Sequence, residues 1–262
     1  MKANTHKLAA GLLAVLTAAG PASAALTGNV SANSEYVFRG ISSSGGAAVQ
    51  GGLEYAHETG LYAGFWGSNV SPVLSDQNEL DLYAGYAPTL NDFVSLDFGA
   101  LYYVFSEDEQ GGGDTDTDYL EVYAGVTIQN LSLYLWYADN FLNVEDNTGV
   151  FPGSGTDDGQ SLYISADYSL PLRDNLSLGL HVGSQLGDGA DAVFGSCVPG
   201  PDDCDDGEYV DYAVTLNADL GKGWGASFGI AGTDVDEDSA VFGDEDKPKY
   251  FVSISKSFTL IE

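Results

Sequence analysis

EYVFRGISSSGGAAVQGGLEYAHETGLYAGFWGSN, residues 35–69, is the stretch that decides the fold. It contains three runs in which apolar and polar residues alternate, separated by a Ser/Gly turn and by the short turn His57–Gly60. Alternation with a period of two, rich in Gly and aromatics and without helical periodicity, is typical of successive antiparallel strands. The rest of the chain repeats this design.

The same pattern predicts twelve strands. Most of them are about nine to twelve residues long, whereas a tilted membrane strand needs roughly 9–11 residues and strands of globular proteins average about 5–6. One face of each strand is apolar, and the other is small, aromatic or acidic. The predicted ranges are 29–41, 47–57, 61–69, 78–87, 93–105, 119–128, 131–139, 161–170, 175–186, 208–219, 224–232 and 249–258.

The connections between these strands alternate in length. Short ones such as Gln129–Asn130 and Pro171–Asn175 alternate with longer ones such as Ser106–Asp118 and Asp139–Gln160. Short turns at one end and long loops at the other are typical of outer-membrane barrels, which close because lipid offers the backbone no hydrogen bonds. The sequence predicts an all-β fold, a transmembrane antiparallel up-and-down β-barrel of about 12 strands. Composition alone also allows a secreted β-sandwich.

The N-terminus has the order of a secretory signal. Lys2 and Lys7 precede an apolar run at residues 8–19, and the small-residue site Ala22–Ala24 follows. We expect residues 1–24 to be a cleaved signal peptide and residues 25–262 to form one barrel domain; a buried N-terminal helix is the alternative. No later segment contains 18 consecutive apolar residues, so the sequence does not predict a transmembrane helix.

The charge of the chain argues against nucleic acid as a partner. The net charge is −31, with 39 acidic and 8 basic residues, and phosphate binding needs clustered Lys and Arg. Most acidic residues lie in the predicted long loops. A solvated, self-repelling surface is the favoured explanation; calcium binding is the alternative, although no loop has the EF-hand spacing. The most acidic stretches are residues 111–118, 202–208 and 234–238.

Two cysteines lie close together in one predicted loop. Cys197 and Cys204 flank six residues of a turn-rich stretch, CVPGPDDC. In an exported chain this spacing favours a local disulfide. Zinc is the alternative, but no second pair of Cys or His lies nearby in the sequence.

Several segments resemble a known family. These are YVFRGIS (36–42), AVQGG (48–52), YAHE (55–58), GLYAGFWGSN (60–69) and the closing SKSF (255–258). They resemble the proteobacterial TorF-like family of outer-membrane porins, catalogued as a conserved domain of unknown function. The resemblance implies a β-barrel in the outer membrane of a Gram-negative bacterium, but no substrate or catalytic residue. One departure is that TLIE follows Phe258, whereas such barrels usually end on an aromatic residue read by the barrel-assembly machinery.

The polar faces of the predicted strands would line a pore. Nine carboxylates and one guanidinium fall on these faces, and charge rings set the sign of the ion admitted, so we expect a preference for cations. The alternative is a structural plug formed by Arg39 and its neighbours. Tyrosines on the same faces could form a stacking track for a sugar or nucleoside, or only fill space. The predicted pore-lining residues are Glu35, Arg39, Glu54, Glu79, Asp81, Asp97, Glu121, Asp167, Asp211, Asp219, Tyr83, Tyr123 and Tyr163.

The sequence does not indicate catalysis. Some twelve-stranded barrels are phospholipases that use Ser, His and Asn, but neither His57 nor His181 has a nucleophile and an orienting group at suitable positions. The expected function is passive diffusion of small solutes, with a preference for cations. Expected partners are outer-membrane lipid, those solutes and the barrel-assembly machinery; no cofactor or metal is indicated. The alternative is a non-conducting structural or surface-binding barrel whose acidic loops bind cations.

Overall fold

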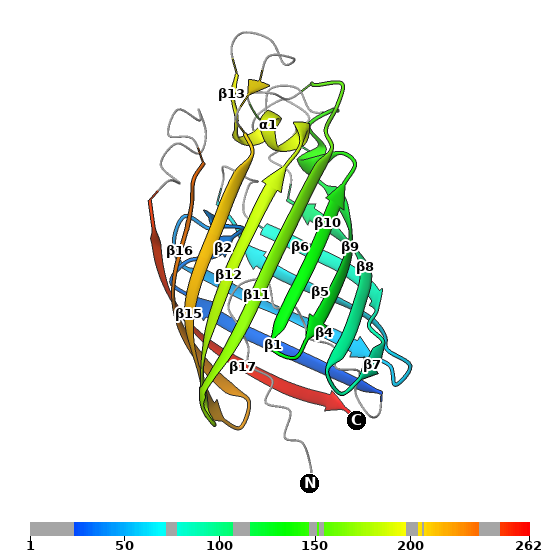
Figure 1. Ribbon diagram of the computed structural model, residues 1–262, viewed down its shortest axis with the longest axis vertical. Coiled ribbons are helices and arrows are strands. Elements are labelled where there is room, and N and C mark those ends of the chain that lie inside the picture. Colours follow the sequence, from blue (N-terminus) through cyan, green and yellow to red (C-terminus); the bar gives the residue numbers. More distant parts are fainter. Residues whose placement is uncertain are drawn as a thin grey trace.

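The main sheet of the protein closes on itself as an antiparallel barrel (Figure 1). The computed structural model describes residues 24–71, 78–106, 116–146, 151, 155–197, 204–205, 207–235 and 247–262. The predicted barrel of about twelve strands is confirmed. Its strands, in order around the barrel, are β1 (Ala25–Asn33), β4 (Ala48–Ala56), β5 (Leu61–Asn69), β6 (Asn78–Tyr86), β8 (Val94–Phe105), β9 (Tyr119–Ile128), β10 (Leu131–Ala138), β11 (Ser161–Arg173), β12 (Leu176–Leu186), β15 (Tyr209–Gly221), β16 (Trp224–Thr233) and β17 (Lys249–Ile261).

Smaller elements decorate this barrel. β7 (Thr89–Asn91) pairs with the start of β8 in a turn. Two short hairpins pair β2 (Val37–Phe38) with β3 (Ile41–Ser42), and β13 (Ser196–Cys197) with β14 (Cys204–Asp205). The 3₁₀ helix η1 (Phe141–Asn143) follows β10, and α1 (Asp188–Phe194) follows β12. Among the described residues, no helix has the length and apolar character needed to cross a membrane.

The connections divide the barrel into two ends. Short turns join β4 to β5, β9 to β10, β11 to β12 and β15 to β16, and we call their side the turn end. The connection from β6 to β8, which contains β7, also lies at this end. The remaining connections are longer and lie at the opposite end, the loop end, where α1 and η1 are found (Figure 1). The C-terminus lies at the turn end (Figure 1).

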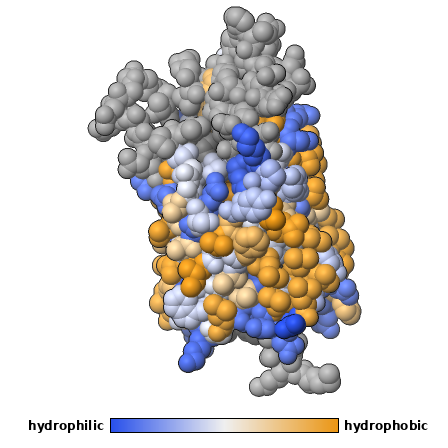
Figure 2. All heavy atoms as spheres, turned by 90° about the vertical axis from the view of Figure 1, so that its left-hand side faces the viewer, coloured by the Kyte–Doolittle hydropathy of each residue, from blue (hydrophilic) through white to orange (hydrophobic). Residues whose placement is uncertain are grey.

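The outer surface of the barrel is apolar. On β6, Leu80 and Leu82 are exposed, whereas Glu79 and Asp81 are buried on the inner face. The same alternation follows the other strands, so exposed Leu, Val, Ile and aromatic side chains cover the wall (Figure 2). On β5, whose aromatics fall on both faces in the sequence, Phe65 is exposed and Trp66 is partly buried. An apolar exterior around a polar interior is the arrangement expected of a barrel in lipid.

Lys256 breaks the apolar pattern of β17, and the sequence allows either snorkelling or a bulge at this position. The pairing of β16 with β17 keeps a regular register, with Trp224 opposite Lys256. The Lys256 ammonium group donates to the carbonyl of Lys222 in the adjacent turn, and it lies 5.7 Å from the ring centre of Trp224. The side chain therefore snorkels to the turn end.

The first predicted strand is wrong at both ends. The range 29–41 predicts one long strand, but β1 begins at Ala25 and ends at Asn33. Ser34 then exchanges hydrogen bonds with Val252 of β17, through its backbone N–H and its side-chain oxygen. The chain leaves the sheet and folds into the barrel as the β2–β3 hairpin. The other eleven strands lie within three residues of their predicted bounds.

A hydrophobic cluster closes the loop end. It joins Tyr103 of β8 and Tyr119 of β9 to η1 and α1, which contribute Phe141 and Phe194, and all four side chains are buried. Burial raises the pKa of the Asp191 carboxyl on α1 above its usual range, although the Gly207 N–H donates to it. We call η1, α1 and the side chains packed beneath them the cover.

Some predictions fall outside the described residues. They include nearly all of the predicted signal peptide and most of the three acidic stretches. The backbones of Cys197 and Cys204 lie opposite each other in the β13–β14 hairpin. Their disulfide stays a prediction.

Candidate functional site

The β2–β3 hairpin crosses the interior of the barrel near the loop end. Its two turn residues have left-handed backbone conformations, with φ of 46° at Arg39 and 81° at Gly40, as a two-residue hairpin turn of the mirror-image type requires. At Gly40 the backbone lies against Asp211 of β15 and Thr233 of β16; a Cβ placed there would lie 2.7 Å from Cβ of Asp211. The hairpin tip is thus wedged against the barrel wall.

Arg39 joins the hairpin tip to the wall by several contacts. Its guanidinium donates to Glu121 of β9 at 2.8 Å and to Gln185 of β12 at 3.0 Å, and it stacks on Tyr163 of β11 at 4.1 Å from the ring centre. Arg39 is 5% exposed and Glu121 is 1% exposed, so the ion pair is buried. The sequence leaves open whether Arg39 lines a pore or holds a plug, and these contacts favour the plug.

His181 is a second basic residue on the inner face. Nδ1 lies 2.7 Å from Asp167 and Nε2 lies 2.9 Å from Asp211. An imidazole donates from both nitrogens only when it is protonated, so this geometry fits the imidazolium. Tyr163 donates to the other oxygen of Asp211 at 2.9 Å, and its ring carries Arg39. His181 and Arg39 therefore belong to one connected polar network.

We expect replacing His181 with Leu to destabilise the folded barrel by roughly 1–3 kcal/mol, because Asp211 stays buried and loses a donor. The measurement is a urea titration of the barrel in detergent, followed by the mobility of unheated samples on a gel. His57→Leu is the matched control, since His57 lies in the turn between β4 and β5 and bonds only locally, to Thr59; it should change stability by no more than about 0.5 kcal/mol. Equal effects of the two substitutions would contradict the network.

Tyrosine hydroxyls bind the carboxylates nearer the turn end. Asp97 of β8 accepts hydrogen bonds from Tyr62 at 2.7 Å and from Tyr134 at 3.1 Å. Tyr62 also bonds to Tyr123, and Tyr83 donates to Glu54 at 3.5 Å. These pairings fix the tyrosines in place and leave their hydroxyls engaged.

Several of these tyrosine side chains lie against glycines of the neighbouring strand. The Tyr83 hydroxyl lies 2.5 Å from where a Cβ on Gly64 would be, and the Tyr163 ring covers Gly183 in the same way. Such close approach is typical of packing against the sheet. It favours the space-filling interpretation of these tyrosines over a stacking track.

The predicted pore-lining residues divide into three groups in the structure. The hairpin network contains Arg39, Glu121, Asp167, Asp211 and Tyr163. The inner wall outside it carries Glu54, Glu79, Asp81, Asp97, Tyr83 and Tyr123. The other two, which the structure brings to neither group, are Glu35, which lies between β1 and β2 outside any strand, and Asp219, whose carboxylate accepts from the Gly221 N–H at the turn end.

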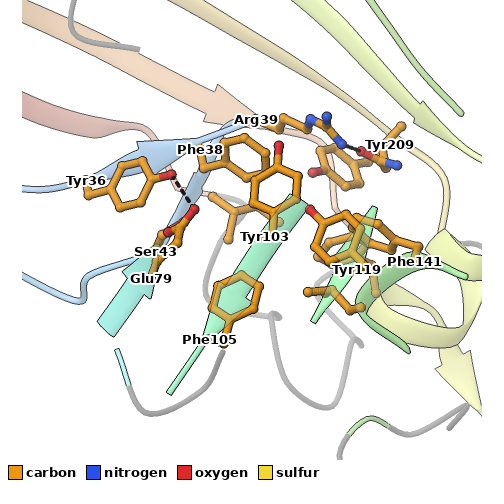
Figure 3. A pocket seen from close by; sticks show the side chains of 14 residues that line it. Tyr36, Phe38, Arg39, Ser43, Glu79, Tyr103, Phe105, Tyr119, Phe141 and Tyr209 are labelled. Carbon is orange, nitrogen blue, oxygen red and sulfur yellow. Dashed lines mark hydrogen bonds between the residues drawn. The ribbon is translucent and has the colours of Figure 1, made fainter. Parts of the chain in front are cut away.

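The hairpin narrows the lumen near the loop end. A cavity of about 40 Å³ lies between the hairpin and the cover, room for about three waters. Eight aromatic side chains, Arg39, Glu79 and Gln185 are among its lining (Figure 3). Further toward the turn end the Asp167 side chain is 40% exposed, so solvent reaches the interior there. The constriction therefore lies in the loop-end half of the barrel.

Sequence reasoning places Tyr103 and His181 on the inner face but misses their partners, and it misses Gln185 altogether. Gln185 and Tyr103, which donates to Glu121 at 3.0 Å, lie on the predicted inner faces but carry no charge that would single them out. His181 falls on the same side, and its spacing from Asp167 and Asp211 follows only from the pairing of β11, β12 and β15. Among the described residues, no group of three or more His, Cys, Asp or Glu side chains could hold a metal ion.

The comparisons with known proteins agree with this fold. The family described as "Bacterial protein of unknown function (Gcw_chp)" matches residues 17–258. A structure of the KdgM porin superposes with a TM-score of 0.53 at 12% identity, over 88% of this chain and 99% of KdgM. A structure of the NanC porin superposes with a TM-score of 0.54 at 11% sequence identity, over 90% of this chain and all of NanC. A structure of KdgM in complex with disordered oligogalacturonate superposes with a TM-score of 0.52 at 12% sequence identity, over 89% of this chain and 99% of KdgM. No curated protein matches the sequence.

Proposed function

Since the chain belongs to the Gcw_chp family of bacterial proteins of unknown function, we propose its function from the barrel itself: a channel in the outer membrane of a Gram-negative bacterium that passes small solutes and prefers cations. The observation that carries this proposal is a closed twelve-stranded barrel with an apolar outer surface and carboxylates on its inner wall. The likeness to the KdgM and NanC porins and the resemblance to TorF-like porins support it.

The acidic interior supports the preference for cations. Asp167 is exposed to the solvent that enters from the turn end, and Asp97 and Glu54 lie on the same wall. Carboxylates in a narrow polar channel concentrate cations and repel anions. Oligogalacturonate, bound by KdgM, is a polyanion, so we do not transfer that substrate class to this chain.

The hairpin favours a second candidate function, a non-conducting structural barrel. It is held by a buried ion pair and leaves only a small cavity beneath the cover. The two candidate functions predict different conductance when the purified protein is inserted into a planar bilayer. We expect purified protein to give reproducible conductance steps, small because the hairpin narrows the lumen. Complete absence of steps from barrels shown to be folded by gel mobility would favour the structural role.

A further inference from the structure

One carboxylate on the inner wall has no balancing partner among the described residues. Asp81 of β6 is 1% exposed, and neither of its side-chain oxygens accepts a hydrogen bond there. Asp97, Glu121 and Asp211, by contrast, each accept hydrogen bonds from Tyr, Arg or His side chains. Burying a polar group without a partner is costly, and burying a charge is more so. Asp81 therefore calls for a counter-charge.

The nearest polar neighbours of Asp81 make this need greater. Glu79 lies two residues from Asp81 on the same inner face of β6, and both carboxyl groups are buried. Ionised carboxylates have no donor to offer each other. Tyr36 donates to Glu79 at 3.4 Å, while the Arg39 guanidinium is directed to Glu121 and Gln185. Two carboxylates side by side in a buried site need either a shared proton or a cation between them.

The surroundings limit the size of that cation. Of the two carboxyl groups, that of Glu79 lines the cavity between the hairpin and the cover, together with the hydroxyl-bearing side chains of Tyr36 and Ser43 (Figure 3). The cavity holds about 40 Å³, room for about three waters. A small ion with a few waters fits this space, whereas a quaternary organic cation does not. Carboxylate and hydroxyl oxygens are hard ligands suited to such an ion.

We infer that Glu79 and Asp81 form a binding site for one small monovalent cation, such as K⁺ or Na⁺, at the loop end of β6. Tyr36, which donates to Glu79, precedes the hairpin directly. A bound cation would therefore stabilise the docked hairpin. The site is independent of the proposed channel, because it can fill whether or not the barrel conducts.

The test compares thermal unfolding of the detergent-solubilised barrel in potassium chloride and in choline chloride at equal ionic strength, read from gel mobility. A ligand that binds only the folded state raises the unfolding temperature. We expect the midpoint to be higher in potassium by roughly 5 °C. Equal midpoints in the two salts would overturn the site and would mean that the pair is neutralised in another way, such as by a shared proton.

Substitutions locate the effect. Asp81→Asn should abolish the difference between the salts, and Glu79→Gln, a second variant in case the first folds poorly, should do the same. Asp97→Asn is the matched control, because Asp97 is already bonded to Tyr62 and Tyr134, and it should keep the full difference. The acidic loops are the same in all variants, so any effect of ions bound around these loops on the unfolding temperature is the same in each of them. Persistence of the potassium effect in both Asp81→Asn and Glu79→Gln would contradict the proposal. No conductance enters this readout, so the channel can fail while the site stands.

Discussion

Replacing Arg39 with Met is expected to destabilise the folded barrel by about 3–5 kcal/mol. The substitution keeps most of the apolar volume of the side chain but removes the cation from a buried ion pair, and Glu121 is then left charged at 1% exposure. Gln185 and the face of Tyr163 lose their partner as well. A urea titration in detergent, scored by gel mobility, measures the change.

Two further variants isolate the ion pair from other effects of the substitution. Arg173→Met removes an exposed guanidinium at the turn end, and it should cost no more than about 0.5 kcal/mol. The double variant Arg39→Met with Glu121→Gln should recover much of the loss, because no uncompensated charge remains. If the double variant is as unstable as the sum of its single substitutions, the pair is not the source of the effect.

Replacing Gly40 with Ala should displace the hairpin from the wall. The φ of +81° disfavours any side chain by roughly 1–2 kcal/mol. The added methyl group would also meet Asp211 at 2.7 Å and the Gly232 carbonyl at 3.0 Å, and overpacking of this kind costs typically about 1–3 kcal/mol. We expect the variant to be less stable by about 2–5 kcal/mol and its conductance steps to be larger.

Gly221→Ala is the control for this experiment. Gly221 lies in the turn between β15 and β16 with nearly the same φ, +82°, and nothing lies within 4 Å of its would-be Cβ. The Gly221→Ala variant therefore has the same backbone strain as Gly40→Ala but no steric clash, and its conductance should match that of the unchanged protein. Equal conductance of the Gly40 and Gly221 variants would show that the hairpin does not control the pore.

The barrel could be predicted from the sequence because its strands carry a two-residue pattern over nearly their full length. Leu80 and Leu82 against Glu79 and Asp81 determine which face of β6 turns outward, and β9 and β11 follow the same rule. The hairpin could not be predicted in this way. Tyr36, Val37, Phe38 and Ile41 are apolar at both parities. Inside the barrel Tyr36, Val37 and Ile41 are buried and Phe38 is partly buried. That absence of a polar face was the available signal against a strand at residues 35–41.

The sequence predicts most residues of the candidate site but not which of them contact one another. The carboxylates on the inner wall follow from strand parity, whereas Arg39 lies in the turn of the hairpin, which parity does not predict. Their partners follow from the pairing of distant strands. The bond from Arg39 to Glu121 spans 82 residues, and the bond from Arg39 to Gln185 spans 146. No local pattern encodes which of the acidic residues the Arg39 guanidinium will meet.

The most direct test of the proposed function is the reversal potential of single channels in a planar bilayer with a gradient of potassium chloride. We predict that the reversal potential has the sign expected for a potassium-selective pore, because the Asp167 carboxylate is exposed to solvent on the inner wall and Asp97 is partly exposed there. Asp167→Asn should reduce this selectivity, since Asp167 is the carboxylate that solvent reaches in the network. A reversal potential of the sign expected for a chloride-selective pore would contradict the proposed cation preference.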